Sequence, residues 1–154
     1  FYARFSGKDD LLFVFIKQIK IEMGAVMELL SVPNQSIDHN LNILFSKFLE
    51  MYCTKAGIFY TLQAQAYQNK DVADELRLMN SNVFLKLENV FSKPAGAQTN
   101  KSFRILLQFA LIATLGTLRA VALDQIFLSR DLTVSKGIIV REMKNLFKSY
   151  LRIK

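Results

Sequence analysis

The sequence predicts an all-α protein, and three observations lead to that class. Apolar residues recur at steps of three and four along most of the 154 residues, which is the spacing of one face of an α-helix. Glycine, proline and short polar residues separate these periodic segments. No two segments alternate as paired strands would, and the chain contains neither an internal repeat nor a low-complexity tract. The punctuation divides the chain into about six helices.

The first half of the chain predicts three of these helices. Paired acids favour a helix start at Asp9, and the apolar spacing continues to about Ser31, before a proline-containing break. Ser36 is a suitable cap for a second helix, which we expect to end at Gly57. A shorter helix is expected over residues 58–69.

The second half predicts three more helices. Acidic residues open a helix at Asp71, and its apolar spacing continues to Lys93. The segment Ser92-Lys93-Pro94-Ala95-Gly96 is the clearest loop in the chain. A long helix follows over about residues 100–127. The last helix has its apolar stripe between Ile139 and Tyr150.

Composition indicates an apolar protein that needs a pocket or a partner. The chain is 51% hydrophobic, and its mean hydropathy is +0.20, which is high for a soluble monomer. Its single cysteine, Cys53, excludes a disulfide within the chain, so we expect a cytoplasmic protein. The longest uncharged run, residues 105–118, is shorter than the roughly 20 residues needed to cross a bilayer. We therefore expect no membrane association.

The net charge of +7 is concentrated near the C-terminal end of the sequence. On the last helix Lys144, Lys148 and Arg152 recur every four residues, opposite the apolar stripe. Such a helix can bind an anionic membrane or an adaptor protein. A solvated face on a bundle helix is the commoner explanation.

Catalytic and metal-binding patterns are missing from the sequence. His39 is the only histidine, and the chain has no Cys-x-x-Cys, no His-Glu-x-x-His and no glycine-rich phosphate loop. A Cys53–His39 pair on one straight helix would be separated by about 21 Å. We therefore predict no enzyme activity, no metal site and no cofactor.

Aromatic and polar side chains alternate on the middle helices, a composition typical of a small-molecule pocket. The alternative is that the aromatic residues form an ordinary core. The candidate ligand-binding residues are Phe48, Tyr52, Phe59, Tyr60, Gln63, Asn82 and Phe84.

The helix over residues 100–127 carries two apolar faces, about 200 degrees apart. One is a leucine stripe (Leu107, Leu111, Leu115 and Leu118), and the other is built of small residues (Ala113, Gly116, Thr117 and Ala120). The first face is explained by the core of the chain. The second requires another packed element, which is either a dimer partner or a further helix of the same bundle.

A short motif near the start of the sequence resembles a known family. Tyr2, Phe5, Lys8 and Leu11 follow the spacing Tyr-x-x-Phe-x-x-Lys-x-x-Leu, which is similar to the junction between the recognition helix and the fourth helix of TetR/AcrR-type transcriptional regulators. The resemblance implies that Tyr2, Arg4 and Lys8 contact DNA phosphates. The sequence departs from the family pattern at Ala3, where a second aromatic is frequent, and at Gly7, where a serine cap is frequent.

The resemblance also implies a domain organisation. Residues 1–8 would be the edge of a helix-turn-helix domain, and residues 9–154 a TetR-like ligand-binding and dimerisation domain. Because the sequence shows no initiator methionine, we expect the base-reading helices before Phe1, so that operator specificity lies outside this sequence. In this family the last two long helices pair in a homodimer. The residues expected there are Ala113, Gly116, Thr117, Ala120, Ile139, Met143 and Phe147.

The function implied is a ligand-responsive regulator, most simply a repressor, that binds operator DNA as a homodimer and is released by a small apolar effector. The effector would act by favouring one position of the first long helix. Few acids are expected to face inward, which predicts an uncharged or weakly anionic effector. Two alternatives stay open: a helical carrier of lipids or other apolar molecules without DNA binding, and a membrane-surface or adaptor bundle.

Overall fold

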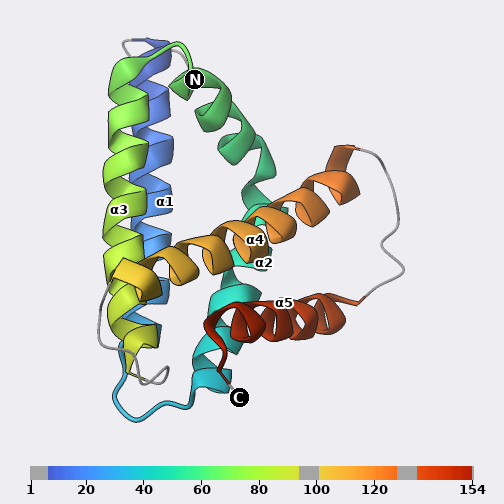
Figure 1. The fold of residues 1–154 in the computed structure, drawn as a ribbon. Helices are drawn as coiled ribbons and strands as arrows, with labels where there is room; N and C mark the ends of the chain where they lie inside the picture. Colours follow the sequence, from blue (N-terminus) through green and yellow to red (C-terminus); the bar gives the residue numbers. More distant parts are fainter. Residues whose placement is uncertain (1–6, 94–100, 128–134, 154) are drawn as a thin grey trace.

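The computed structural model describes residues 7–93, 101–127 and 135–153, and over these residues the protein is all-helical, without strands (Figure 1). Five helices make up the described chain: α1 (Lys8–Leu30), α2 (Ile37–Ala66), α3 (Lys70–Ser92), α4 (Lys101–Phe127) and α5 (Lys136–Leu151). The all-α prediction is confirmed.

The expected pair of helices on either side of Gly57 is instead one helix with a kink, so the predicted number of six is not observed in the described chain. The non-helical residue within α2 is Lys55, with φ −126° and ψ 23°. Next to it, the Thr54 hydroxyl donates to the Glu50 carbonyl at 2.9 Å, a bond that bends helices. An interior glycine costs about 1 kcal/mol relative to alanine but does not by itself end a helix.

Side-chain caps fix where three helices begin. Ser36 accepts a hydrogen bond from the His39 amide at 3.2 Å, as expected from the sequence. Asn69 accepts from two amides at the start of α3, those of Asp71 at 3.0 Å and Val72. Ser135 caps α5 through the Ile138 amide. These bonds satisfy amides that have no partner within the helix.

The helices form two groups that meet at α2. α1 and α3 lie side by side and run in the same direction, and an ion pair between Lys20 and Glu75 joins them (Figure 1). α4 crosses in front of α2, and α5 lies antiparallel beside α4 (Figure 1). The kinked C-terminal half of α2 leans away from α4 towards the start of α3.

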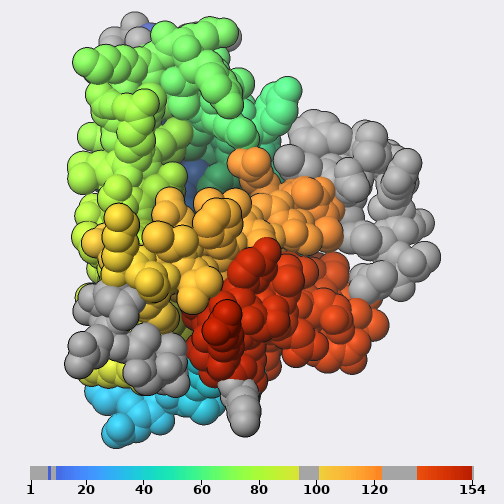
Figure 2. Space-filling view, viewed as in Figure 1, coloured from blue at the N-terminus to red at the C-terminus, as the bar shows by residue number. Residues whose placement is uncertain are grey.

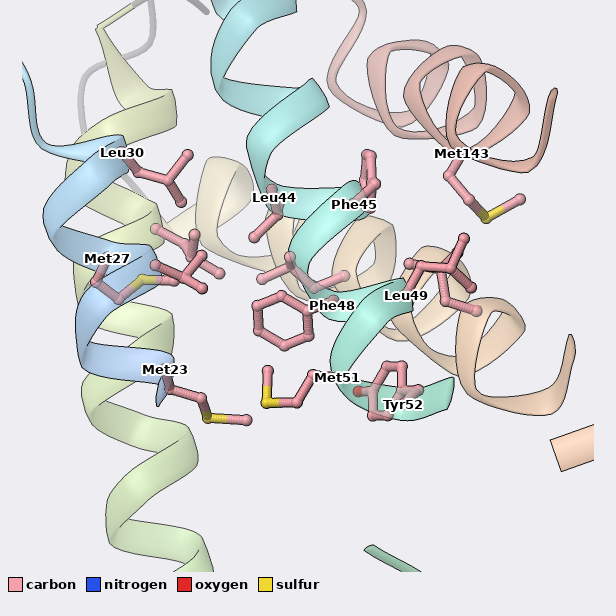
Figure 3. Close-up of a cluster of buried hydrophobic side chains, with 14 of the residues drawn as sticks. Met23, Met27, Leu30, Leu44, Phe45, Phe48, Leu49, Met51, Tyr52 and Met143 are labelled. Carbon is pink, nitrogen blue, oxygen red and sulfur yellow. The ribbon is translucent and has the colours of Figure 1, made fainter. Parts of the chain in front are cut away.

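The core is built on both sides of α2. Leu44 and Phe48 point towards the α1 methionines, whereas Phe45 and Leu49 point towards α5 (Figure 3). Phe147 of α5 closes the far side, because its ring lies 5.8 Å from that of Phe45 and 5.0 Å from that of Phe91. This arrangement fixes α3 and α5 relative to α2.

Candidate functional site

A large cavity lies between α3 and α4. Its volume is about 960 Å³, and its floor includes Met23 of α1 with Phe48 and Tyr52 of α2. Figure 2 shows the hollow between the green helices and the yellow-orange α4, with α1 visible at its bottom. A volume of this size is at the upper end of the range for small-molecule sites.

A second cavity of about 330 Å³ adjoins the first and shares Met23, Tyr52 and Asn80 with it. It extends towards the C-terminal half of α2, where Gln63 and Arg119 line it. We call the two cavities together the central hollow. All of the first four helices contribute to its walls.

The central hollow brings together most of the expected ligand-binding residues. Phe48, Tyr52 and Phe84 line the first cavity, and Tyr52, Phe59 and Gln63 line the second. Tyr52 is central, since it packs edge-on against Phe48 at 6.0 Å and against Phe59 at 4.9 Å.

Two expected ligand-binding residues lie elsewhere. Tyr60 is 61% exposed and lines only a small recess beside Tyr52. Asn82 lines a separate cavity of about 240 Å³ between α1 and α3, on the side of Lys20 and Lys86. For Asn82 this follows from helix geometry, because it lies on the face that α3 turns towards α1.

Sequence analysis missed the polar wall that α4 contributes. The polar residues of this wall are Lys101, Arg104 and Gln108 in the first cavity and Arg119 in the second. Their spacing of three, four and eleven residues is that of one helix face. This signal was present in the sequence, between the two apolar faces that were recognised.

Electrostatically the central hollow is basic. The Arg119 guanidinium donates from Nη1 to Gln63 Oε1 at 2.9 Å. Burial raises the pKa of Tyr52 to about 12, and the nearby Arg119 opposes this shift. Arg104 is 3.2 Å from the buried carboxylate of Glu88, and its guanidinium lies 5.9 Å from the centre of the Phe84 ring.

The small residues expected at a dimer interface are only partly covered by the chain itself. Gly116, Thr117 and Ala120 are exposed and Ala113 is half-buried. Large apolar side chains continue the same side of the helix. We call this surface the α4 outer face, and it consists of Ile105, Leu106, Phe109, Ile112, Ala113, Gly116, Thr117 and Ala120.

The α5 residues expected at the interface are placed inside the protein. Ile139, Met143 and Phe147 are all buried in the core. The apolar stripe was recognised correctly, but it faces α2 and α4 of the same chain. Among the large apolar side chains of α5, Ile138 and Tyr150 are exposed instead.

The basic repeat of α5 has a partner within the chain. Lys144 and Lys148 lie 3.5 and 3.4 Å from Asp38 at the start of α2. Both lysine side chains are only about one-fifth exposed. Two of the three repeated basic residues are thus occupied in holding α5 against α2, which weakens the argument for an anionic membrane surface.

Neither a metal site nor a nucleophile pair is assembled in the described parts of the chain. No three side chains among His, Cys, Asp and Glu come together there. His39 is exposed in the first turn of α2, whereas the half-buried Cys53 lies four turns further along the same helix.

Tyr2 and Arg4 of the expected DNA-contacting set lie outside the described residues, and so does the side chain of Lys8. Lys8 is nevertheless the first residue of α1. The motif therefore leads directly into the helix whose Met23 lines the central hollow.

One helix of the described chain is long and apolar enough to cross a membrane, namely the Lys101–Ala122 part of α4. Length and composition are weak evidence, because core helices of soluble proteins have the same character. About a third of its most apolar stretch is buried, and much of the remainder forms the α4 outer face. The sequence matches no family model and no curated protein, and the chain has no match among solved structures.

Proposed function

We propose that the chain is the sensing and pairing part of a ligand-responsive transcriptional regulator of the TetR/AcrR type, acting in the cytoplasm as a homodimeric repressor. The observation that carries the proposal is that the central hollow reaches α1 at Met23. α1 continues from the residues that resemble the junction with a DNA-binding domain. A ligand in the hollow would thus touch the helix expected to hold the DNA reader.

An ion pair between α1 and α2 also supports the proposal that a movement of α1 carries the effect of the ligand to the DNA reader. Lys55, at the kink of α2, lies 2.7 Å from Glu22 of α1. Glu22 is adjacent to Met23, which lines the hollow. An effector that displaces Met23 would therefore act on α1 next to its ion pair with α2. For release of DNA, it must bind one position of α1 more tightly than the other.

Pairing would occur through the α4 outer face. Phe109 is 58% exposed and Ile112 is 63% exposed, and small residues beside them allow a second helix to approach closely. Contiguous exposed apolar surface of this kind is typical of an interaction site. Two copies would bury it against each other.

The test is a gel shift of the complete protein on DNA from upstream of its own gene, repeated at several salt concentrations. Phosphate contacts predict that the logarithm of the binding constant falls linearly with the logarithm of salt concentration, by about 0.9 per phosphate contacted. A compound that binds the hollow should release the DNA. Absence of specific binding to any upstream fragment would reject the proposal.

A matched pair of variants tests whether a compound bound in the hollow controls DNA binding. Asn80→Trp places a large ring in the hollow from an exposed position on α3, whereas Leu78→Trp places it on α3 away from both cavities. We expect Asn80→Trp to remove the response to the compound, and Leu78→Trp to retain it. An unchanged response in both variants would contradict a sensing role of the hollow.

The hollow by itself favours a second candidate, a carrier of apolar molecules without DNA binding. This function predicts compound binding with no upstream DNA bound at any salt concentration. Binding to anionic liposomes in a sedimentation assay would instead favour the membrane-surface alternative.

A further inference from the structure

We propose that the ligand of the central hollow is an extended apolar molecule with one anionic head group, and that Arg119 binds the head group. This inference rests on the proposed sensing function and specifies its effector. It follows from the charges that line the hollow, from the contacts of its two arginines and from the length of the apolar wall.

The first step concerns the sign of the charge on the ligand. Among the described residues that line the two cavities there is no aspartate and no glutamate, whereas Lys101, Arg104 and Arg119 are cationic. A cationic ligand would be repelled by these residues and would find no carboxylate. An anion would gain a charge-assisted hydrogen bond, which is stronger than a neutral one.

The second step selects between the two arginines. Arg104 already contacts the buried Glu88 carboxylate and lies over the Phe84 ring. Among the side chains that the structure describes, no carboxylate lies within salt-bridge distance of Arg119, and the partner of its Nη1 is the neutral Gln63 amide oxygen. Its side chain is exposed, so the unpaired charge stays hydrated when the hollow is empty.

The third step places the head group. Gln63 and Tyr52 line the same cavity as Arg119. A guanidinium has five N–H donors in a planar fork, and several are left for a second acceptor after the bond to Gln63. A carboxylate or phosphate matches this fork with two oxygens. The amide of Gln63 and the phenol of Tyr52 are further polar groups at this end.

The fourth step concerns the tail. From Arg119 back to Arg104, α4 rises through fifteen residues, or about 22 Å at 1.5 Å per residue. Between these ends most of the α4 side chains that line the hollow are apolar, Leu111 and Leu115 among them, with Gln108 as the polar exception, and Met23 of α1 adds to the apolar wall. An extended hydrocarbon chain fits such a wall better than a compact polycyclic molecule.

The experiment compares ligands with one tail and different head groups. Palmitate, hexadecyl phosphate, hexadecanol and hexadecylamine would compete, below their micelle concentrations, against a fluorescent fatty acid bound to the protein. An extrinsic probe is needed because the chain has no tryptophan. We expect at least one of the two anions to bind ten or more times tighter than the alcohol and the amine, and the tighter anion identifies the head group.

Variants then assign the head-group residue. Arg119→Gln should weaken anion binding about tenfold and leave hexadecanol affinity unchanged. Arg77→Gln is the matched control, because Arg77 is an exposed arginine on α3 that lines neither cavity. Circular dichroism would verify that both variants fold.

Three results would overturn the inference: equal affinity for palmitate and hexadecanol, an unchanged affinity of Arg119→Gln for the anions, or no binding of any of the four compounds. The gel shift of the complete protein distinguishes these failures from failure of the proposed function. If an uncharged or cationic compound released the DNA, the proposed regulator function would stand and only the anionic effector would be rejected.

Discussion

At the scale of single residues, Tyr52 is the most connected side chain of the central hollow. It contacts the rings of Phe48 and Phe59 and lines both cavities. Burial holds its phenol in the neutral form, while the charge of Arg119 favours the phenolate. The pKa of Tyr52 therefore depends on the charge of Arg119 even when no ligand is bound.

This coupling predicts an alkaline transition. Because burial raises the pKa of Tyr52 from 10.0 to about 12, the folded protein keeps a proton that the unfolded chain loses above pH 10. The contribution of Tyr52 to the free energy of unfolding should be complete below pH 10. It should fall by about 1.4 kcal/mol per pH unit between pH 10 and 12.

Urea unfolding of the wild-type protein and Tyr52→Phe across this range gives the measurement, since other groups titrate in both proteins and cancel in the difference. Arg119→Gln should raise the pKa of Tyr52 further, as followed by phenolate absorbance. A Tyr52 that titrates near its ordinary pKa of 10.0 would contradict its burial in the hollow.

At the residue scale the structure also shows which of the expected ligand-binding residues lie together. Phe48, Tyr52 and Phe59 were predicted from the mixture of aromatic and polar side chains, and they meet in one hollow. Arg104 and Arg119 were missed because α4 was interpreted by its apolar residues alone. A charged side chain can be assigned to a pocket wall only when the orientation of its helix is known, and that orientation depends on tertiary packing.

At the scale of helices, local signals predicted where a helix begins better than whether it continues. Ser36 caps α2 as expected, because a cap depends on residues within one turn. The break expected at Gly57 became a kink at Lys55, two residues earlier. The contact from Lys55 to Glu22 joins two residues on different helices that are far apart in the sequence, so no local pattern contains it.

The cap of α3 gives a test at this scale. Asn69 accepts hydrogen bonds from the amides of Asp71 and Val72, and removal of its side chain leaves both without this partner. We expect Asn69→Ala to lower the free energy of unfolding by about 1 kcal/mol, and Asn69→Asp to retain most of it. Chemical denaturation measures both. Equal losses in the two variants would show that the carbonyl-type oxygen at this position is unimportant.

For the whole molecule, the α4 outer face explains the apolar composition of the chain. The core accounts for one face of α4, and the other face keeps Phe109 and Ile112 in contact with solvent. The sequence predicted the face of small residues. It did not predict that the α5 stripe is internal, because an apolar stripe has the same spacing whether it packs on its own chain or on a partner.

Pairing through this face makes a measurable prediction. Ile112→Glu should convert a dimer to a monomer in sedimentation equilibrium, because burying an unpaired carboxylate in an apolar interface is costly. Leu78→Glu is the control, an exposed leucine on α3 outside the α4 outer face. A wild-type monomer, or a dimer that tolerates Ile112→Glu, would exclude this mode of assembly.

Ile105 and Ile112 belong both to the α4 outer face and to the wall of the central hollow. If the protein pairs through this face and binds a ligand in the hollow, as proposed, a shift of these two isoleucines on one side displaces them on the other, so self-association and ligand affinity are thermodynamically linked. Linkage is reciprocal: if occupancy strengthens association by some factor, association strengthens occupancy by the same factor. The apparent ligand affinity of this protein is then a function of its own concentration.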